Sequence, residues 1–164
     1  MTTAICPGSF DPVTLGHMDI IRRASHLFDR VIVVVMPNQT KSPLFSQVER
    51  IELLNRAIQD EGLPNVAVDC YDGLLADYVS MRQADAIVKG LRAMSDFEYE
   101  FQMALTNRRL NPRAETVFLT TTAEHMYLSS SLVKQVANYG GDISDFVPAC
   151  IIPDINRKYR KAGK

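Results

Sequence analysis

Short runs of apolar residues alternate along this chain with longer segments in which apolar residues recur every three or four positions. The short runs predict five β-strands, at residues 2–6, 31–36, 66–71, 86–89 and 116–121. These runs are continuous rather than alternating, which is typical of parallel strands covered on both faces. The longer segments predict helices at residues 17–28, 46–59, 74–83, 96–110 and 129–139.

The predicted helices carry end signals and apolar stripes. The second begins with Ser46 and Glu49 at capping-box spacing, and the fifth ends at Gly140 and Gly141, which suit a helix C-cap. The stripes predict which side chains are buried. They are Met18, Ile21, Ala24, Leu27 and Phe28 in the first helix, Val48, Ile51, Leu54 and Ile58 in the second, and Phe97, Phe101, Ala104 and Leu105 in the fourth.

The order of the elements predicts the fold. Five strands separated by helices predict an α/β fold with a doubly wound, five-stranded parallel sheet. The chain has 164 residues, enough for one domain whose core needs neither a disulfide nor a metal. We therefore expect a single domain over residues 1–164, with a basic helix or tail from about residue 154. The basic residues of this end are Arg157, Lys158, Arg160, Lys161 and Lys164.

Composition excludes several classes of protein. The chain has 18 Lys and Arg against 19 Asp and Glu, a net charge of −1, whereas a dedicated nucleic-acid binder has a strong basic bias. The cysteines Cys6, Cys70 and Cys150 form no CxxC pair, so we expect buried or surface thiols without redox or metal chemistry. A strand begins almost at the N-terminus and no apolar run approaches 18 residues, so we expect no signal peptide, no membrane contact and a cytoplasmic location.

The candidate site lies beyond the carboxyl ends of the strands, where such sheets bind ligands. Neither GxGxxG nor the P-loop motif occurs. The first strand is followed by Gly8 and Ser9, and the first helix opens with Gly16 and His17. The free N–H groups at a helix start favour an anion, and His17 could donate to a phosphoryl oxygen there. A helix-start histidine with no task fits the same position equally well.

Three cations follow strands of the predicted sheet. Lys89 and Arg92 flank Gly90 after the fourth strand, an arrangement that suits a polyphosphate, and Lys41 after the second strand could add a third charge. The alternatives are a lysine stem that snorkels to the surface and a plain surface lysine. These residues therefore favour a phosphate site mainly as a group.

Hydroxyl groups cluster at the start of the fifth helix, where Ser129, Ser130 and Ser131 follow one another. One serine is enough for an N-cap, so we expect the others to serve a second phosphate group. Glu98 and Glu100 are two residues apart on a helix and diverge, which argues against a hydrolytic pair. The sequence has neither a metal-ligand cluster nor a GxSxG elbow. Donors and cations without a nucleophile indicate phosphoryl or nucleotidyl transfer by positioning and charge stabilisation.

Several motifs resemble those of a known family. TLGH at residues 14–17 and LSSS at 128–131 resemble the two signatures of the nucleotidyltransferase superfamily. KGLRA at 89–93 and DFEYEFQMA at 96–104, followed by Asn107 and Arg108, are more specific. Together with PGSFDP at 7–12, they closely resemble the bacterial phosphopantetheine adenylyltransferase family. The resemblance extends from the first strand to about Pro148.

The resemblance implies a Rossmann-like nucleotidyltransferase fold and a step of coenzyme A biosynthesis. ATP and 4'-phosphopantetheine would react by direct in-line attack to give dephospho-coenzyme A and pyrophosphate. The resemblance also implies Mg²⁺, a homohexamer built as a dimer of trimers, and coenzyme A as a candidate feedback ligand. His17 would be the catalytic residue, stabilising the transition state. ATP would be held by Ser9, Phe10, His17, Gly90, Leu91, Arg92, Glu100, His125, Met126, Tyr127, Leu128, Ser129, Ser130 and Ser131, and phosphopantetheine by Ser9, Lys41, Leu75 and Lys89.

The acceptor site should combine cations with an apolar channel, because pantetheine is a long uncharged arm of amides. We expect Leu75 and Met103 to line that channel, with Asn107 as an amide partner. The wider set of flanking residues contains Leu74, Tyr99 and Leu105. Lys89 departs from the Arg found in many relatives, keeping the charge but losing the bidentate fork. His125 stands where some relatives carry an aromatic residue.

Two alternatives stay open at this point. One is another adenylyl- or cytidylyltransferase of the same superfamily, acting on nicotinate mononucleotide or an alcohol phosphate. The other is a non-catalytic nucleotide-binding or sensor protein. The intact His17, Lys41 and Arg92 argue against the second alternative, and the stretch from Lys89 to Arg108 argues against the first.

Overall fold

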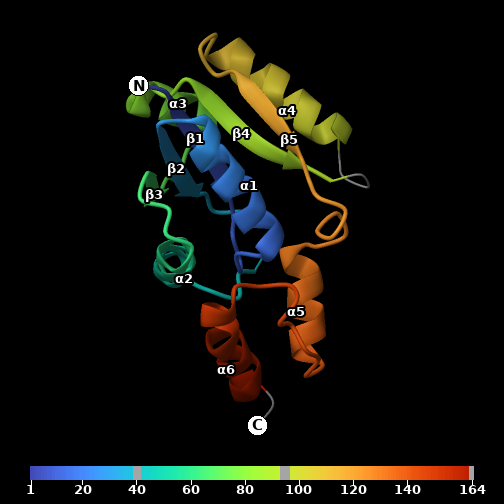
Figure 1. Ribbon diagram of the computed structural model, residues 1–164. Coiled ribbons are helices and arrows are strands. Elements are labelled where there is room, and N and C mark those ends of the chain that lie inside the picture. The colour runs from blue at the N-terminus through green and yellow to red at the C-terminus, as the bar shows by residue number, and fades with distance from the viewer. Residues whose placement is uncertain (39–41, 93–96, 163–164) are drawn as a thin grey trace.

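The computed structural model describes residues 1–38, 42–92 and 97–162, and it contains the predicted doubly wound sheet (Figure 1). In these ranges five parallel strands form one sheet in the order β3-β2-β1-β4-β5. The strands are β1 (Thr3–Gly8), β2 (Arg30–Val35), β3 (Val66–Cys70), β4 (Ala86–Leu91) and β5 (Thr116–Thr120). All five strands predicted from the sequence are thereby confirmed, and no end differs by more than two residues.

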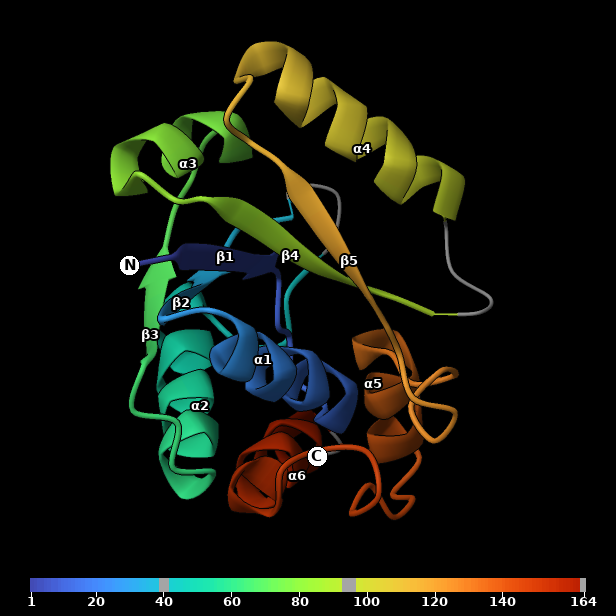
Figure 2. The same ribbon diagram turned by 45° about the horizontal axis from the view of Figure 1, so that its top comes forward.

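Helices cover both faces of the sheet. Figure 2 shows α1, α2, α5 and α6 on one side of the sheet, and α3 and α4 on the other. The helices are α1 (Leu15–Leu27), α2 (Gln47–Asp60), α3 (Leu75–Arg82), α4 (Phe97–Leu110), α5 (Ser130–Asn138) and α6 (Ile152–Ala162), the last preceded by the 3-10 turn η1 (Ala149–Ile151). The basic C-terminal segment is therefore a helix, beginning two residues before the predicted position.

Successive residues of each central strand enter different cores, because side chains alternate across a strand. Cys6 and Val33 belong to the larger core beneath α1, α2, α5 and α6, whereas Ile5, Ile32 and Ile87 belong to the smaller core beneath α3. Both faces of β1 and β2 are thus apolar. This explains why their sequences show continuous apolar runs.

The apolar stripes of the helices extend beyond the buried faces. Val48 in α2 is 75% exposed and Leu27 in α1 is 62% exposed, contrary to the prediction that these side chains are buried. In α4, Phe97, Phe101 and Leu105 are also about half exposed. Figure 2 shows the reason, since α4 lies on the outside of the molecule and is not covered by another layer. Hydrophobic periodicity identified the helix correctly but not what covers it.

The sheet opens between β1 and β4, where the order of the strands reverses. Over their fully described lengths, β1 pairs with β2 at six positions but with β4 at two, Ala4 with Ala86 and Ile5 with Ile87. The two strands therefore separate toward their carboxyl ends. Such a switch point is where doubly wound sheets bind their ligands. No helix in the described part of the chain is long and apolar enough to cross a membrane.

Candidate active site

A cavity of about 470 Å³ lies at the carboxyl ends of β1 and β4, between the first residues of α1 and α5. It brings together most of the residues that the sequence motifs singled out, although these lie in five separate segments of the chain. The cavity is lined by Ser9, Phe10, His17, Lys89, Gly90, Arg92, Glu100, His125, Leu128, Ser129, Ser130 and Ser131. Asn38 and Thr121 also line it and were not singled out from the sequence.

The TLGH motif forms a reciprocal helix cap. The Thr14 side chain accepts a hydrogen bond from the backbone N–H of His17 at 3.2 Å, and the Thr14 backbone N–H donates to Nδ1 of His17 at 3.0 Å. In an ordinary capping box a Glu or Gln side chain takes this second bond. Because a backbone N–H can only donate, Nδ1 must be the acceptor. The neutral ring therefore carries its proton on Nε2, which is left to serve the cavity.

His17 stays uncharged at neutral pH. Burial, followed by the charges of Arg92 and Lys89, lowers the pKa of its imidazole from 6.5 to about 4. The ring of Phe10 packs edge-on against it, with 5.1 Å between the centroids. Phe10 itself has a φ of 47°, a left-handed conformation that is uncommon for a bulky residue. The site thus holds His17 as a neutral hydrogen-bond donor rather than as a proton source.

The two predicted cations after β4 lie against the cavity with different partners. Nη1 of Arg92 donates to the carbonyl oxygen of Leu128 at 2.9 Å, which ties the end of β4 to the segment before α5. Nζ of Lys89 lies 3.4 Å from the carboxylate of Glu100. Gly90 allows β4 to pass close to α1, because a Cβ there would lie 2.9 Å from the side chain of Ile20. Arg92 is therefore held by a neutral carbonyl group, whereas Lys89 forms a partly buried ion pair with Glu100.

The three serines have separate environments at the start of α5. Ser129 is the N-cap, and its hydroxyl accepts from the backbone N–H of Leu132 at 3.1 Å. Ser130 donates to the carbonyl oxygen of Pro12 at 2.8 Å, which joins α5 to the segment after β1. Ser131 is exposed to the cavity. The capping role predicted for one serine is confirmed, and the helix directs its N-terminus at the cavity.

A second cavity of about 460 Å³ adjoins the first and shares Ser9, Lys89 and Glu100 with it. It extends toward α3 and α4 and has the mixed apolar and amide lining that the sequence analysis expected. Its lining contains Leu74, Leu75, Tyr99, Met103 and Asn107, but not Leu105. Asn107 is 7% exposed overall. The cationic end and the apolar channel therefore meet at Lys89.

Two buried charged residues, Asp11 and Arg50, hold segments next to the first cavity in place. The sequence motifs gave no role to either residue. The carboxylate of Asp11 accepts from the backbone N–H groups of Leu44 and Phe45, at 2.8 and 2.9 Å, and from Lys134 at 3.0 Å. Arg50 donates to the carbonyl oxygen of Ser9 at 2.9 Å. The sequence offered a signal for Asp11, since it lies in the PGSFDP motif. Arg50 occupies an ordinary polar position of a helix, where burial is not expected.

Some predicted residues lie elsewhere. Leu91, Met126 and Tyr127 do not contribute to the lining of the first cavity as far as the chain is described. Leu91 offers its carbonyl to Thr121, and Tyr127 is 57% exposed with its ring against Phe146. Lys41 lies outside the described residues. Within the described ranges no three His, Cys, Asp or Glu side chains group in a way that could hold a metal ion.

Comparison with known proteins identifies relatives of this chain. A family model for cytidylyltransferase-like proteins matches residues 5–136. A phosphopantetheine adenylyltransferase from Caldanaerobacter subterraneus subsp. tengcongensis is 56% identical over 99% of this chain and 100% of its own length. Another, from Alkaliphilus metalliredigens, is 54% identical over 96% of this chain and 99% of its own length.

Solved structures of lower identity share the fold. A Vibrio parahaemolyticus protein described as a nicotinate-nucleotide adenylyltransferase aligns with a TM-score of 0.71 and 22% identity, covering 98% of this chain and 97% of its own. The Plasmodium falciparum nicotinic acid mononucleotide adenylyltransferase, complexed with NaAD, aligns with a TM-score of 0.59 and 15% identity over 98% and 95% of the two chains. At these identities the likeness concerns the fold alone.

The His17 cap gives a prediction about protonation. In ¹⁵N-resolved NMR, His17 should be the neutral Nε2–H tautomer throughout the range from about pH 5.5 to 8, because its pKa in the folded protein is about 4. The unfolded chain binds this proton near pH 6.5, so folding stability should fall as the pH is lowered from about 6.5 to 4. A titration midpoint near 6.5, or a proton on Nδ1, would contradict the cap assignment.

Proposed function

The chain belongs to the phosphopantetheine adenylyltransferase family, and on that premise we propose how its site transfers the AMP part of ATP to 4'-phosphopantetheine. The products are dephospho-coenzyme A and pyrophosphate, and the reaction is a step of coenzyme A biosynthesis. The protein is therefore a nucleotidyltransferase enzyme. The proposal rests on one observation, which is that two cavities meet at Lys89. One cavity lies beside His17, and the other forms a channel with apolar lining residues.

The two cavities fit the two substrates. ATP needs donors for its phosphates, which the first cavity offers through His17, Arg92 and the N-terminus of α5. Phosphopantetheine has one ionic end and a long arm of amides, and the second cavity has Lys89 at one end with Leu75, Met103 and Asn107 beyond it. The acceptor phosphate would then lie at the shared wall, facing the α-phosphate of ATP.

The reaction is a single in-line displacement at phosphorus. An oxygen of the acceptor phosphate attacks the α-phosphorus of ATP, the new P–O bond forms, and the bond from that phosphorus to the bridging oxygen of the β-phosphate breaks. The electron pair of the broken bond leaves with pyrophosphate. No covalent enzyme intermediate is needed. The protein acts by aligning the two phosphates and stabilising the charge that builds on them.

His17 supplies a donor at the reacting centre. Its Nε2–H donates to an α-phosphate oxygen, and the bond strengthens as the oxygen gains negative charge in the transition state. A neutral imidazole suits this role, because its proton stays on the ring. Arg92 stabilises the triphosphate and Lys89 the acceptor phosphate, with Ser9 between the two cavities.

The remaining contacts follow the family resemblance. The resemblance assigns phosphopantetheine to Ser9, Leu75 and Lys89, together with Lys41, which lies outside the described residues. ATP is held by Phe10, Gly90, Leu91, Arg92, Glu100 and residues 125–131, of which Leu91, Met126 and Tyr127 are chain neighbours of lining residues rather than lining residues themselves. Coenzyme A contains both an adenylate and a pantetheine arm, so we propose that it binds across both cavities as a feedback ligand.

Mg²⁺ enters the reaction with ATP in this proposal. The described residues offer no carboxylate cluster, and Glu100, the acidic side chain that lines the first cavity, is paired with Lys89. Mg²⁺ binds readily to the phosphates of a nucleotide while keeping several waters. We therefore propose Mg–ATP as the substrate, in which the phosphates would hold the metal and the metal would supply positive charge to them. A cytoplasmic location is proposed as well, in keeping with Cys6, Cys70 and Cys150, which are all free thiols.

The identity of the acceptor can be tested with a panel of compounds. With Mg–ATP, the protein should adenylylate 4'-phosphopantetheine, should not react with unphosphorylated pantetheine, and should use nicotinate mononucleotide with a kcat/KM at least ~10³ lower. The reason is that polar groups of the wrong acceptor would be left unpaired in the channel. Products are identified by mass, and chelation of Mg²⁺ should stop the reaction.

His17→Ala is the matched control for that assay. It should lower kcat by at least ~10², the usual cost of one preorganised donor, which separates this enzyme's own turnover from a contaminant's. Comparable turnover of the two phosphorylated acceptors would refute the acceptor assignment. Binding of ATP without any adenylylated product would favour a non-catalytic nucleotide-binding protein instead.

The second prediction separates the two substrates. Lys89→Met keeps the length of the side chain but removes its charge, so it should raise the KM for phosphopantetheine roughly 10-fold or more while changing the KM for ATP much less. Lys89→Arg should retain substantial activity, because the cation survives. Steady-state kinetics with each substrate varied in turn measures both. Equal damage to the two KM values would mean that Lys89 serves the triphosphate.

The third prediction concerns assembly as a homohexamer, a dimer of trimers. The exposed apolar side chains of α4 support it, since a monomer seldom leaves several large hydrophobes together on one helix. Sedimentation velocity should give a hexamer for the wild type and smaller species for Phe101→Asp. Val48→Asp, an equally drastic change at an exposed site of α2, is the control and should stay hexameric. A monomeric wild type would contradict the proposal.

A further inference from the structure

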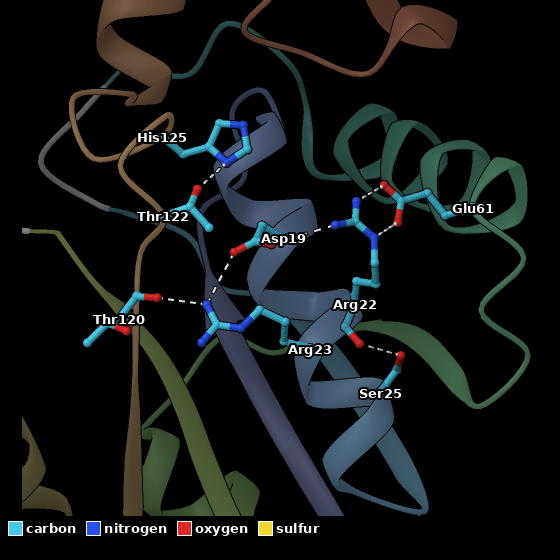
Figure 3. Close-up of polar contacts among 8 residues, drawn as sticks. All are labelled: Asp19, Arg22, Arg23, Ser25, Glu61, Thr120, Thr122 and His125. Atoms are coloured by element: carbon cyan, nitrogen blue, oxygen red, sulfur yellow. Dashed lines mark hydrogen bonds and ion pairs between the residues drawn. The ribbon is translucent and has the colours of Figure 1, made fainter.

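Arg23 links the middle of α1 to the carboxyl end of β5 across 97 positions of the sequence. Its Nη1 donates to the carbonyl oxygen of Thr120, the last residue of β5, at 2.7 Å. The same nitrogen lies 3.3 Å from Oδ2 of Asp19, one turn earlier on the helix. Figure 3 shows the guanidinium of Arg23 between these two acceptors.

Asp19 orients two neighbouring arginines in different directions. It is buried, with 8% of its surface exposed, and its two carboxylate oxygens face Arg22 and Arg23. Arg22 extends toward α2 and makes two bonds to Glu61 at the end of that helix, at 2.7 and 2.8 Å (Figure 3). The two arginines therefore share Asp19 but differ in their second partner, which lies at the end of α2 for Arg22 and in β5 for Arg23.

The segment that begins after Thr120 forms one wall of the nucleotide cavity. Thr121 is held by two bonds to the carbonyl oxygen of Leu91, and it lines the cavity together with His125 and Leu128. Within the segment, Thr122 and His125 contact each other through their side chains at 3.1 Å. His125 packs beside the first turn of α1, since a Cβ added to Gly16 would lie 3.5 Å from the Cβ of His125.

We propose that Arg23 is a positioning residue for ATP. Its bond to Thr120 fixes where residues 121–128 leave the sheet, relative to the helix whose first turn carries His17. Asp19 holds the guanidinium in the direction that makes this bond. The inference rests on the proposed function, in that it assigns the cavity to ATP. Arg23 itself does not line the cavity, so it acts through the segment that it anchors.

The effect should be confined to one substrate. The second cavity is lined from β1, β4, α3, α4 and neighbouring segments. β5 contributes Thr116, its first residue, but none of residues 121–128 contributes in the described structure. Loosening the start of that segment should therefore disturb the adenylate half of the site and leave the pantetheine channel intact. A role in stability alone would spare both KM values.

The experiment compares Arg23→Ala with Arg22→Ala. Both variants remove an arginine of α1 that faces Asp19, but only the first loses the bond to Thr120. For Arg23→Ala, the KM for ATP should rise about 10-fold, since the lost bond is made by a charged donor. The KM for phosphopantetheine should stay within about twofold of the wild type. Arg22→Ala should change neither KM, although it should lower the melting temperature because its bonds to Glu61 are lost.

Arg23→Lys provides a second variant that keeps the charge beside Asp19, and it should recover part of the affinity for ATP. An unchanged KM for ATP in Arg23→Ala, an equal rise in Arg22→Ala, or a parallel rise in both KM values would each overturn the inference. Calorimetric binding of Mg–ATP to the wild type and both alanine variants is measured alongside the kinetics. If the wild type binds ATP but transfers no AMP, the proposed function fails while the binding data still decide the role of Arg23.

Discussion

The pair of hydrogen bonds between Thr14 and His17 is the local interaction on which the geometry of the first cavity depends. A helix start needs partners for its free N–H groups, and here an imidazole takes the place that a carboxylate usually fills. These two bonds cap the start of α1, and the bond to Nδ1 leaves the proton of the ring on Nε2. Burial and the neighbouring cations then keep that ring neutral. The start of the helix and the tautomer of the ring therefore have the same cause.

The opening of the sheet leaves room for a cavity beside His17. β1 and β4 pair at their amino ends and separate beyond Ile5 and Ile87, so the two cavities can meet where the strands diverge. Buried charged groups hold the segments that surround the first cavity. Asp11 joins the segment after β1 to the start of α2 and to α5, and Arg50 fixes the carbonyl of Ser9. These bonds stabilise a geometry that local sequence preference alone would leave loose.

Hydrophobic patterning predicted the strands and helices because apolar residues of the two cores recur along the whole chain. The predictions that failed concern exposure. Val48 and Leu27 continue an apolar stripe past the edge of the core, and the apolar residues of α4 face outward. Periodicity records which residues share a face of a helix, not whether another element covers that face. The same limit applies to Leu91 and Tyr127, whose motif positions are near the cavity but whose side chains do not line it.

The sequence by itself determined the fold class and the family, and it singled out His17, Lys89, Arg92 and Ser129, which line one cavity at the carboxyl edge of the sheet. Each of these depends on residues close together in the chain or on an apolar run. Only the tertiary structure decided that Arg23 holds Thr120, that Arg50 holds Ser9, and that Lys89 lies between two cavities. Those contacts join positions from 41 to 97 residues apart or depend on how far two strands diverge. Packing sets such distances, and no local pattern encodes them.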